Sequence, residues 1–153
     1  MPNLVIRGVA DLRANVGKEL GTSEWLRVDQ ARIDLFADAT DDHQWIHVDA
    51  QRAQTGPWGG TIAHGFLTLS LLPALLAQTY RLEDFSMVVN YGLDRVRFPA
   101  PVPAGSRIRA SSTLTEVIDR PPAVQGKITA TVEIEENDKP ACIAELLGAY
   151  YPA

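Results

Sequence analysis

One segment of this chain, residues 65–80, is apolar on almost every side, and it constrains the fold more than any other feature. Its sequence is GFLTLSLLPALLAQTY. A helix without a polar face has to be buried on most of its surface, and the length of the segment favours a helix over the alternative of a buried strand. Pro73 removes one backbone hydrogen bond and predicts a kink. The apolar run 66–77 is too short to cross a bilayer, so we expect no membrane segment here.

The second half of the chain shows the alternation of apolar and polar residues that is typical of β-strands. Three stretches have it, at residues 107–117, 124–136 and 141–151. Because successive side chains of a strand point to opposite faces, the first stretch places five residues on one face: Ile108, Ala110, Ser112, Leu114 and Glu116. Short links between the stretches predict an antiparallel meander, and two further strands are expected at 87–91 and 93–98.

A buried helix and a long antiparallel sheet are reconciled most economically by wrapping the sheet around the helix, which predicts an α+β fold. The first half of the chain is rich in helices and loops. Asp29 suits the N-cap of an amphipathic helix at 30–39, and Asp49 suits the cap of a short helix that ends at 56–57. We also expect a short helix at 9–16, a strand at 24–28 and a polar loop at 40–47.

Composition narrows the possible roles. The 153 residues have the length of one domain, expected to extend over 1–153. Fourteen Lys and Arg against nineteen Asp and Glu give a net charge of -5, without the basic block that nucleic-acid binding needs. The single cysteine, Cys142, excludes an internal disulfide and a Cys-rich metal site. The N-terminus has no basic leader followed by a long apolar run, so we expect no signal peptide and a cytoplasmic protein.

Asp42 and His47 are the first candidate site residues, five positions apart in the expected polar loop. A carboxylate and an imidazole can together hold one water, because one accepts its proton while the other orients it and passes a proton on. Each residue alone has an ordinary structural explanation. An aspartate after a helix is commonly a turn or cap residue, and a histidine beside Trp45 and Ile46 is commonly a satisfied structural side chain.

Gly65 is the third candidate, at the start of the apolar segment and directly after His64. The first amides of a helix have no partner within it and carry partial positive charge. Glycine lets a ligand approach the backbone closely, and an amide here suits the oxygen of a polarised carbonyl. The alternative is that Gly65 only permits a tight entry into the helix.

These segments resemble the MaoC-like dehydratases, the (R)-specific enoyl-CoA hydratase group with the hot-dog fold. The family pattern is Ser/Thr-Gly-Asp-x-Asn-Pro-aliphatic-His, followed by His-Gly at the central helix. The chain supplies four positions of the run in register: Thr40, Asp42, Ile46 and His47. It departs at three positions, with Asp41 for glycine, Gln44 for asparagine and Trp45 for proline. The departures, with the runs at 90–92 and 97–102, look more like the branch of nodulation protein N and the short mycobacterial hydratases.

The resemblance implies a hot-dog fold, a homodimer with clefts lined by both subunits, and an acyl-CoA substrate without a cofactor. It implies that water adds to a trans-2-enoyl thioester and gives an (R)-3-hydroxyacyl product. Asp42 would be the general base, His47 would hold the same water and help to return a proton to the α carbon, and the Gly65 amide would bind the thioester oxygen. The sequence does not divide the proton steps between Asp42 and His47.

Several alternatives stay open. His43 and His47 have the spacing of two zinc ligands on a helix, with Asp38, Asp41 and Asp42 nearby, but no third ligand stands at a fixed spacing, so we expect no metal. A thioesterase or a non-catalytic acyl-thioester binding protein could use the same fold. Four arginines could meet the CoA phosphates and could equally be solvated strand residues: Arg95, Arg97, Arg107 and Arg109.

Overall fold

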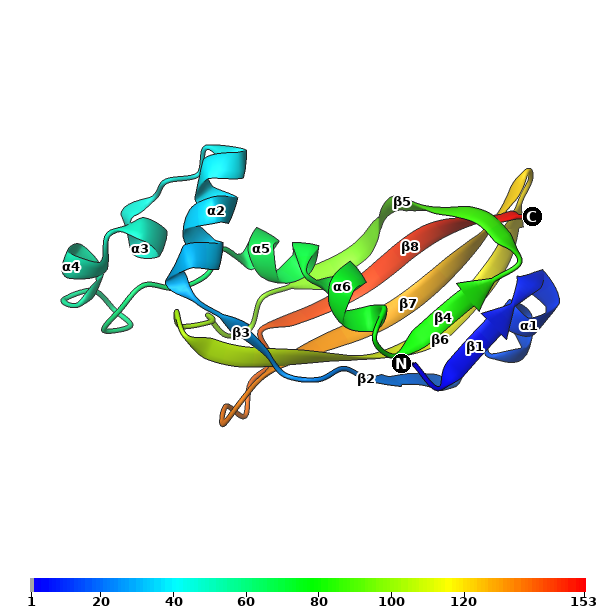
Figure 1. The fold of residues 1–153 in the computed structure, drawn as a ribbon, viewed down its shortest axis with the longest axis horizontal. Helices are drawn as coiled ribbons and strands as arrows, with labels where there is room; N and C mark the ends of the chain where they lie inside the picture. Colours follow the sequence, from blue (N-terminus) through cyan, green and yellow to red (C-terminus); the bar gives the residue numbers. More distant parts are fainter. Residues whose placement is uncertain (1) are drawn as a thin grey trace.

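The computed structural model describes residues 2–153, in which a six-stranded antiparallel sheet curves around a pair of short helices (Figure 1). The strands follow the order β2-β6-β7-β8-β5, and β3 pairs with β6 beside β2. Their bounds are β2 Glu19–Thr22, β3 Leu26–Val28, β5 Phe85–Arg97, β6 Ser106–Arg120, β7 Ala123–Ile134 and β8 Cys142–Pro152. This arrangement confirms the predicted α+β fold with its antiparallel meander.

The alternation read from the sequence places the core on the concave face of the sheet. Buried and half-buried residues alternate along β7 from Val124 to Ile134. On β6 the predicted inward face is buried as far as Leu114. Glu116 was predicted to share that face but is exposed, because the register between β6 and β7 shifts between Leu114 and Glu116. A bulge of this kind moves every later side chain to the opposite face.

The central helix is two helices, α5 Gly65–Ser70 and α6 Leu72–Leu76, where a single helix over 65–80 was predicted. Pro73 lies in the first turn of α6, where a missing N–H breaks no intrahelical hydrogen bond. The proline therefore begins a new helix instead of kinking a long one. The helices are also buried on one side only, since Phe66 is 68% exposed. No helix within residues 2–153 has the length and apolar character needed to cross a membrane.

The last predicted helical residue, Tyr80, begins a strand. Strand β4 Tyr80–Glu83 pairs in parallel with β1 Leu4–Arg7, and the two form a separate small sheet. Neither strand was predicted from the sequence.

The other helices lie in the first third of the chain. Helix α1 is Gly8–Ala14, and α2 Gln30–Thr40 begins as predicted, with the Asp29 carboxylate accepting from the Arg32 amide at 2.9 Å. Helix α3 Trp45–Val48 occupies part of the expected loop, which was therefore predicted wrongly, and α4 Ala50–Ala53 follows the Asp49 cap. Helices α2, α3 and α4 project beyond the end of the sheet (Figure 1).

Strand β5 forms one edge of the large sheet and, among the strands of residues 2–153, pairs with β8 alone. The two strands predicted at 87–91 and 93–98 are one strand with irregular register at three points. Phe85 and Val96 of this strand pack against the core. Its other large apolar side chains are exposed: Met87, Val88, Val89, Tyr91 and Leu93. An edge with unpaired backbone groups and exposed apolar side chains is a surface that another chain can cover.

Candidate active site

Three elements meet at one point beyond the end of the sheet. Asp42 follows α2, His47 lies in α3, and His64 stands immediately before α5. One side-chain ligand atom of each lies within 4.8 Å of the others. The structure therefore brings together Asp42 and His47, as predicted, and places Gly65 directly after the third member of the group.

The turn after α2 presents Asp42. Helix α2 ends at Thr40, and the next residue, Asp41, caps it with φ 59° in the left-handed region. Glycine adopts this conformation without steric cost and aspartate tolerates it, which explains why glycine is usual at this position of the family pattern. The Asp42 carboxylate is exposed and accepts the Gln44 amide N–H at 3.4 Å. It is therefore free to receive a proton from a water molecule.

His47 is buried, with 6% of its surface exposed, and its Nδ1 atom lies 2.7 Å from the backbone carbonyl oxygen of Ile62. A carbonyl only accepts, so Nδ1 carries the proton and Nε2 of the neutral ring has the free lone pair. Burial lowers the pKa of His47 below its ordinary value. The Ile62 amide donates in turn to the Ile46 carbonyl at 3.0 Å, which fixes the acceptor in place.

Gly65 begins α5, so its amide has no acceptor within the helix. Its φ is not positive. A Cβ atom at this position would lie 3.1 Å from the Phe98 ring, closer than the about 3.5–4.0 Å of a favourable carbon contact. The packing of Phe98 alone therefore explains the glycine, and the role of its amide as a donor stays a prediction. Gly65 and His47 line the same cavity of about 300 Å³.

A larger hollow of about 940 Å³ lies between the two central helices and strands β5 and β8. Its lining is mainly apolar and includes Leu69, Ser70, Ala77, Tyr80, Val88 and Tyr150. The Tyr150 ring packs over glycine, since a Cβ atom at Gly126 would lie 2.7 Å from it. Burial raises the pKa of the Tyr80 and Tyr150 phenols, so both stay protonated at neutral pH.

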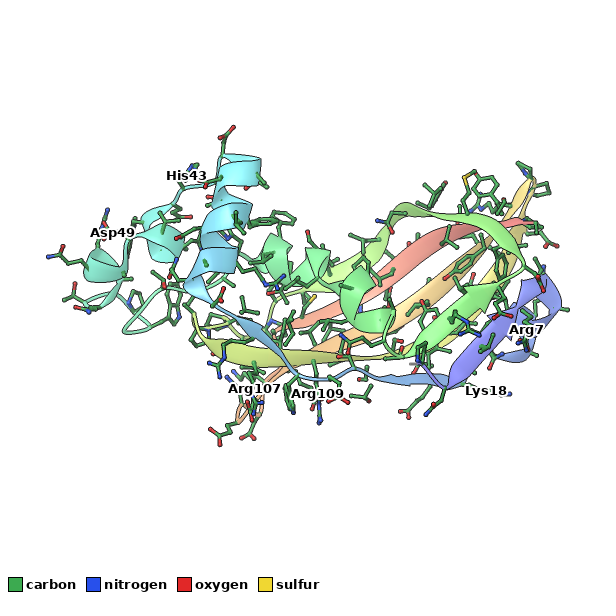
Figure 2. All side chains as sticks on the ribbon, viewed as in Figure 1. Arg7, Lys18, His43, Asp49, Arg107 and Arg109 are labelled. Atoms are coloured by element: carbon green, nitrogen blue, oxygen red, sulfur yellow. The ribbon has the colours of Figure 1, made fainter. Side chains whose placement is uncertain are left out.

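The group of Asp42, His47 and His64 does not fit a shared metal ion as it stands. The His47 and His64 rings are stacked, with centroids 3.8 Å apart and planes at 23°. A metal binds in the plane of each imidazole, and stacked rings direct their lone pairs side by side instead of toward one point. His43, the other ligand of the metal alternative, is outside the group and lies 2.9 Å from Asp38 on an exposed surface. Figure 2 shows His43 at the outer end of the α2 region.

The four candidate arginines divide into two pairs. Arg107 and Arg109 on β6 form ion pairs with Glu135 and Glu133, and Arg109 also lies over the Trp25 ring at 4.4 Å. Figure 2 shows both side chains pointing away from the central helices. Arg95 and Arg97 lie on the exposed edge strand β5. Only this second pair is placed on the uncovered edge.

His64 is the site residue that sequence reasoning missed. Its position beside Gly65 was visible, but its role depends on contacts that only the fold creates. It is 2% exposed, stacks on His47 and donates from Nε2 to the backbone carbonyl of Asp42 at 3.0 Å.

Comparisons with known proteins identify the family to which the chain belongs. The family model described as MaoC like domain matches residues 11–137. The 3-hydroxyacyl-thioester dehydratase Z of Mycobacterium tuberculosis (strain ATCC 25618 / H37Rv) is 54% identical over 143 residues, 93% of this chain and 95% of that protein. Nodulation protein N of Rhizobium leguminosarum bv. viciae is 51% identical over 139 residues, 89% of this chain and 86% of that protein.

A solved structure shows the same fold. The R-hydratase PhaJ1 from Pseudomonas aeruginosa, in its unliganded form, superposes with a TM-score of 0.74 at 21% identity, covering 90% of this chain and 83% of that chain. The fold is the hot-dog fold that the sequence predicted. From the family match and the two relatives, the chain belongs to the MaoC-like dehydratase family.

Proposed function

We propose that this protein is an acyl-thioester hydratase that adds water reversibly to trans-2-enoyl-CoA and forms (R)-3-hydroxyacyl-CoA. The observation that carries the proposal is the pairing of the exposed Asp42 carboxylate with the neutral, buried His47 within 4.8 Å. The reverse reaction, loss of water from a 3-hydroxyacyl thioester, is the activity in the name of the mycobacterial relative. The (R) configuration is what the resemblance of the Thr40–His47 run implies.

The geometry suggests how the pair would act on one water. The Asp42 carboxylate accepts one proton of the water while the water oxygen forms a bond to C3 of the enoyl group. His47 accepts a hydrogen bond from the other O–H at Nε2 and thereby orients the molecule. Because Nε2 carries no proton in the resting state, the proton delivered to C2 is the one taken from the water. The product gains a hydroxyl at C3 and a hydrogen at C2.

The Gly65 amide would stabilise the intermediate state. As the bond to C3 forms, the electrons of the double bond move toward the thioester oxygen, which gains negative charge. An N–H donor that is preorganised at this oxygen lowers the barrier. Gly65, whose amide has no acceptor within α5, lines the same cavity as His47, so both could contact one thioester.

The larger hollow would take the acyl chain. Leu69 and Ser70, one helical turn beyond Gly65, are among its lining residues. Its volume of about 940 Å³ lies within the range of ligand pockets, roughly 300–1,000 Å³. An apolar lining of this kind favours a hydrocarbon chain over a polar group.

The enzyme would work as a homodimer paired through strand β5. Val88, Tyr91 and Leu93 belong both to the exposed edge strand and to the lining of the hollow. A second copy placed along β5 would bury the unpaired edge and close the side of the hollow with the same contacts.

Product analysis with crotonyl-CoA tests the proposal. The expected product is 3-hydroxybutyryl-CoA of (R) configuration, separated from its enantiomer by chiral chromatography after hydrolysis. Release of free CoA without the hydroxy product would identify a thioesterase, and binding without turnover would identify an acyl-thioester binding protein. Either result would overturn the proposed hydratase.

A further inference from the structure

His64 contacts both members of the proposed catalytic pair through different parts of its ring. Its Nε2 atom donates to the backbone carbonyl of Asp42 at 3.0 Å. Its face stacks on the ring of His47, with centroids 3.8 Å apart. The His64 ring also contacts the Phe36 ring, whose centroid is 4.9 Å away with the two planes at 58°. One side chain therefore fixes the main chain that carries Asp42 and the plane in which the His47 imidazole lies.

His64 also connects this pair to the start of the central helix. Its backbone carbonyl accepts the amide N–H of Leu67 at 3.1 Å and of Thr68 at 3.3 Å, which forms the first turn of α5. Gly65 is the next residue in the chain. The residue thus joins the three proposed parts of the site: the carboxylate, the imidazole and the helix amide.

The two ring nitrogens of His64 have different surroundings. A backbone carbonyl only accepts, so Nε2 carries a proton. No protein group within residues 2–153 hydrogen-bonds to its buried Nδ1 atom. The Nε2 proton is therefore held on the Asp42 carbonyl, and this arrangement suits a fixed support for the main chain at Asp42.

We propose that His64 is a positioning residue that holds Asp42 through its Nε2 hydrogen bond and His47 through ring stacking, and that turnover depends on both contacts. The inference rests on the proposed hydratase function. The reaction rate depends steeply on the position of the catalytic groups, and a displacement of about 1 Å can lower it by about 100-fold.

Two substitutions separate the two contacts. His64→Phe keeps an aromatic ring to stack on His47 but has no donor for Asp42. His64→Gln keeps an N–H donor but has no ring. We expect each to lower kcat for crotonyl-CoA hydration by about 10-fold, with KM changed by less than about 3-fold, because the supports act on reacting groups and not on substrate binding. The matched controls are His43→Phe and His43→Gln, at an exposed histidine outside the group, which should leave kcat unchanged.

Double variants show through which residue each contact acts. In an Asp42→Asn background, His64→Phe should cause no further loss of kcat, since its partner's function is already gone. In a His47→Gln background, the same should hold for His64→Gln. A general weakening of the fold would instead multiply with the other substitution. Circular dichroism and the melting temperature establish in parallel that each variant is folded.

The outcomes distinguish this inference from the proposed function. If the wild-type protein does not hydrate crotonyl-CoA, the proposed function fails. If the wild type is active and both folded His64 variants keep its kcat, the positioning role is wrong. The positioning role is also wrong if the His64 substitutions lower kcat by the same factor in the Asp42→Asn and His47→Gln backgrounds as in the wild type. His64 would then act independently of the pair.

Discussion

The Nδ1 atom of His47 lies 2.7 Å from the backbone carbonyl oxygen of Ile62. This single contact determines the tautomer of the imidazole, because the carbonyl requires a donor. The remaining nitrogen, Nε2, is then an acceptor in the neutral ring. The roles in the proposed reaction depend on this arrangement. Asp42 accepts a proton from the water and returns it to C2, while His47 accepts a hydrogen bond from the same water at Nε2.

Hydration activity should depend on pH through His47. Burial lowers its pKa, so the ring is neutral above the ordinary value of about 6.5 and becomes protonated only in more acidic solution. Protonation removes the Nε2 lone pair. We expect kcat/KM for crotonyl-CoA to be level between about pH 6.5 and 8 and to fall in more acidic buffer. A profile that still rises steeply above pH 7 would contradict a neutral resting His47.

The lowered pKa of His47 also makes the free energy of unfolding depend on pH. A histidine whose pKa is lower in the folded state binds its proton more readily when the chain is unfolded. The free energy of unfolding is therefore fully retained above the pKa of the unfolded state and decreases as the pH falls below it. The pKa of His43 is raised by its hydrogen bond to Asp38, which works in the opposite direction. Urea unfolding of wild type and His47→Gln at several pH values therefore isolates the His47 contribution.

Substitution of Gly65 tests whether its lack of a side chain serves packing against Phe98. A Cβ atom at Gly65 would lie 3.1 Å from the Phe98 ring, and overpacking of this kind costs about 1–3 kcal/mol. Since Phe98 is 41% exposed, its ring has room to move, and we expect Gly65→Ala to lower the free energy of unfolding by about 1 kcal/mol. Phe98→Leu in the same chain should restore most of that loss. Equal destabilisation with and without Phe98→Leu would show that another contact requires the glycine.

The sequence predicted the elements whose pattern is local. Strands β6, β7 and β8 follow from alternation, and the start of α2 follows from Asp29. The pair β1 and β4 was missed because each strand has four residues without a periodic pattern, and the partners are distant in the chain. The break before α6 was missed because a proline inside an apolar run is compatible with a kink or with a new first turn.

The candidate site divides in the same way. Asp42, His47 and Gly65 could be named from a motif, since their spacing is a property of the chain. His64 could not be given a role, because its stacking on His47 and its bond to the Asp42 carbonyl join segments that only folding brings together. Which arginines are engaged in ion pairs likewise depends on the register between β6 and β7.

Filling the large hollow should change the acyl-chain preference. Ala77 lines the hollow and is exposed, so Ala77→Phe adds a ring there without disturbing the core. We expect kcat/KM for octenoyl-CoA to fall by about 10-fold or more, the scale of a few lost methylene contacts, while crotonyl-CoA is little affected. Ala74→Phe is the matched control, because Ala74 is exposed in α6, three residues before Ala77, but does not line the hollow. Equal behaviour of the two variants would exclude the hollow as the acyl site.

A charge on the exposed edge strand should separate the proposed dimer. Val89 is 45% exposed on β5 and does not line the hollow, so Val89→Lys introduces repulsion and a desolvation cost only where two copies would meet. Light scattering should give a mass near twice 16.7 kDa for the wild type and 16.7 kDa for the variant. Thr22→Lys, on the opposite edge of the sheet, should stay dimeric. A wild type that is monomeric at micromolar concentration and fully active would refute the dimer.

The central claim is that Asp42 and His47 together activate one water for addition to an enoyl thioester. The most direct test is the steady-state rate of crotonyl-CoA hydration by wild type, Asp42→Asn and His47→Gln, each with its fold verified by circular dichroism. Both substitutions should lower kcat by about 100-fold or more, the usual scale for removing an acid/base group. Hydration near the wild-type rate by either folded variant would contradict the account.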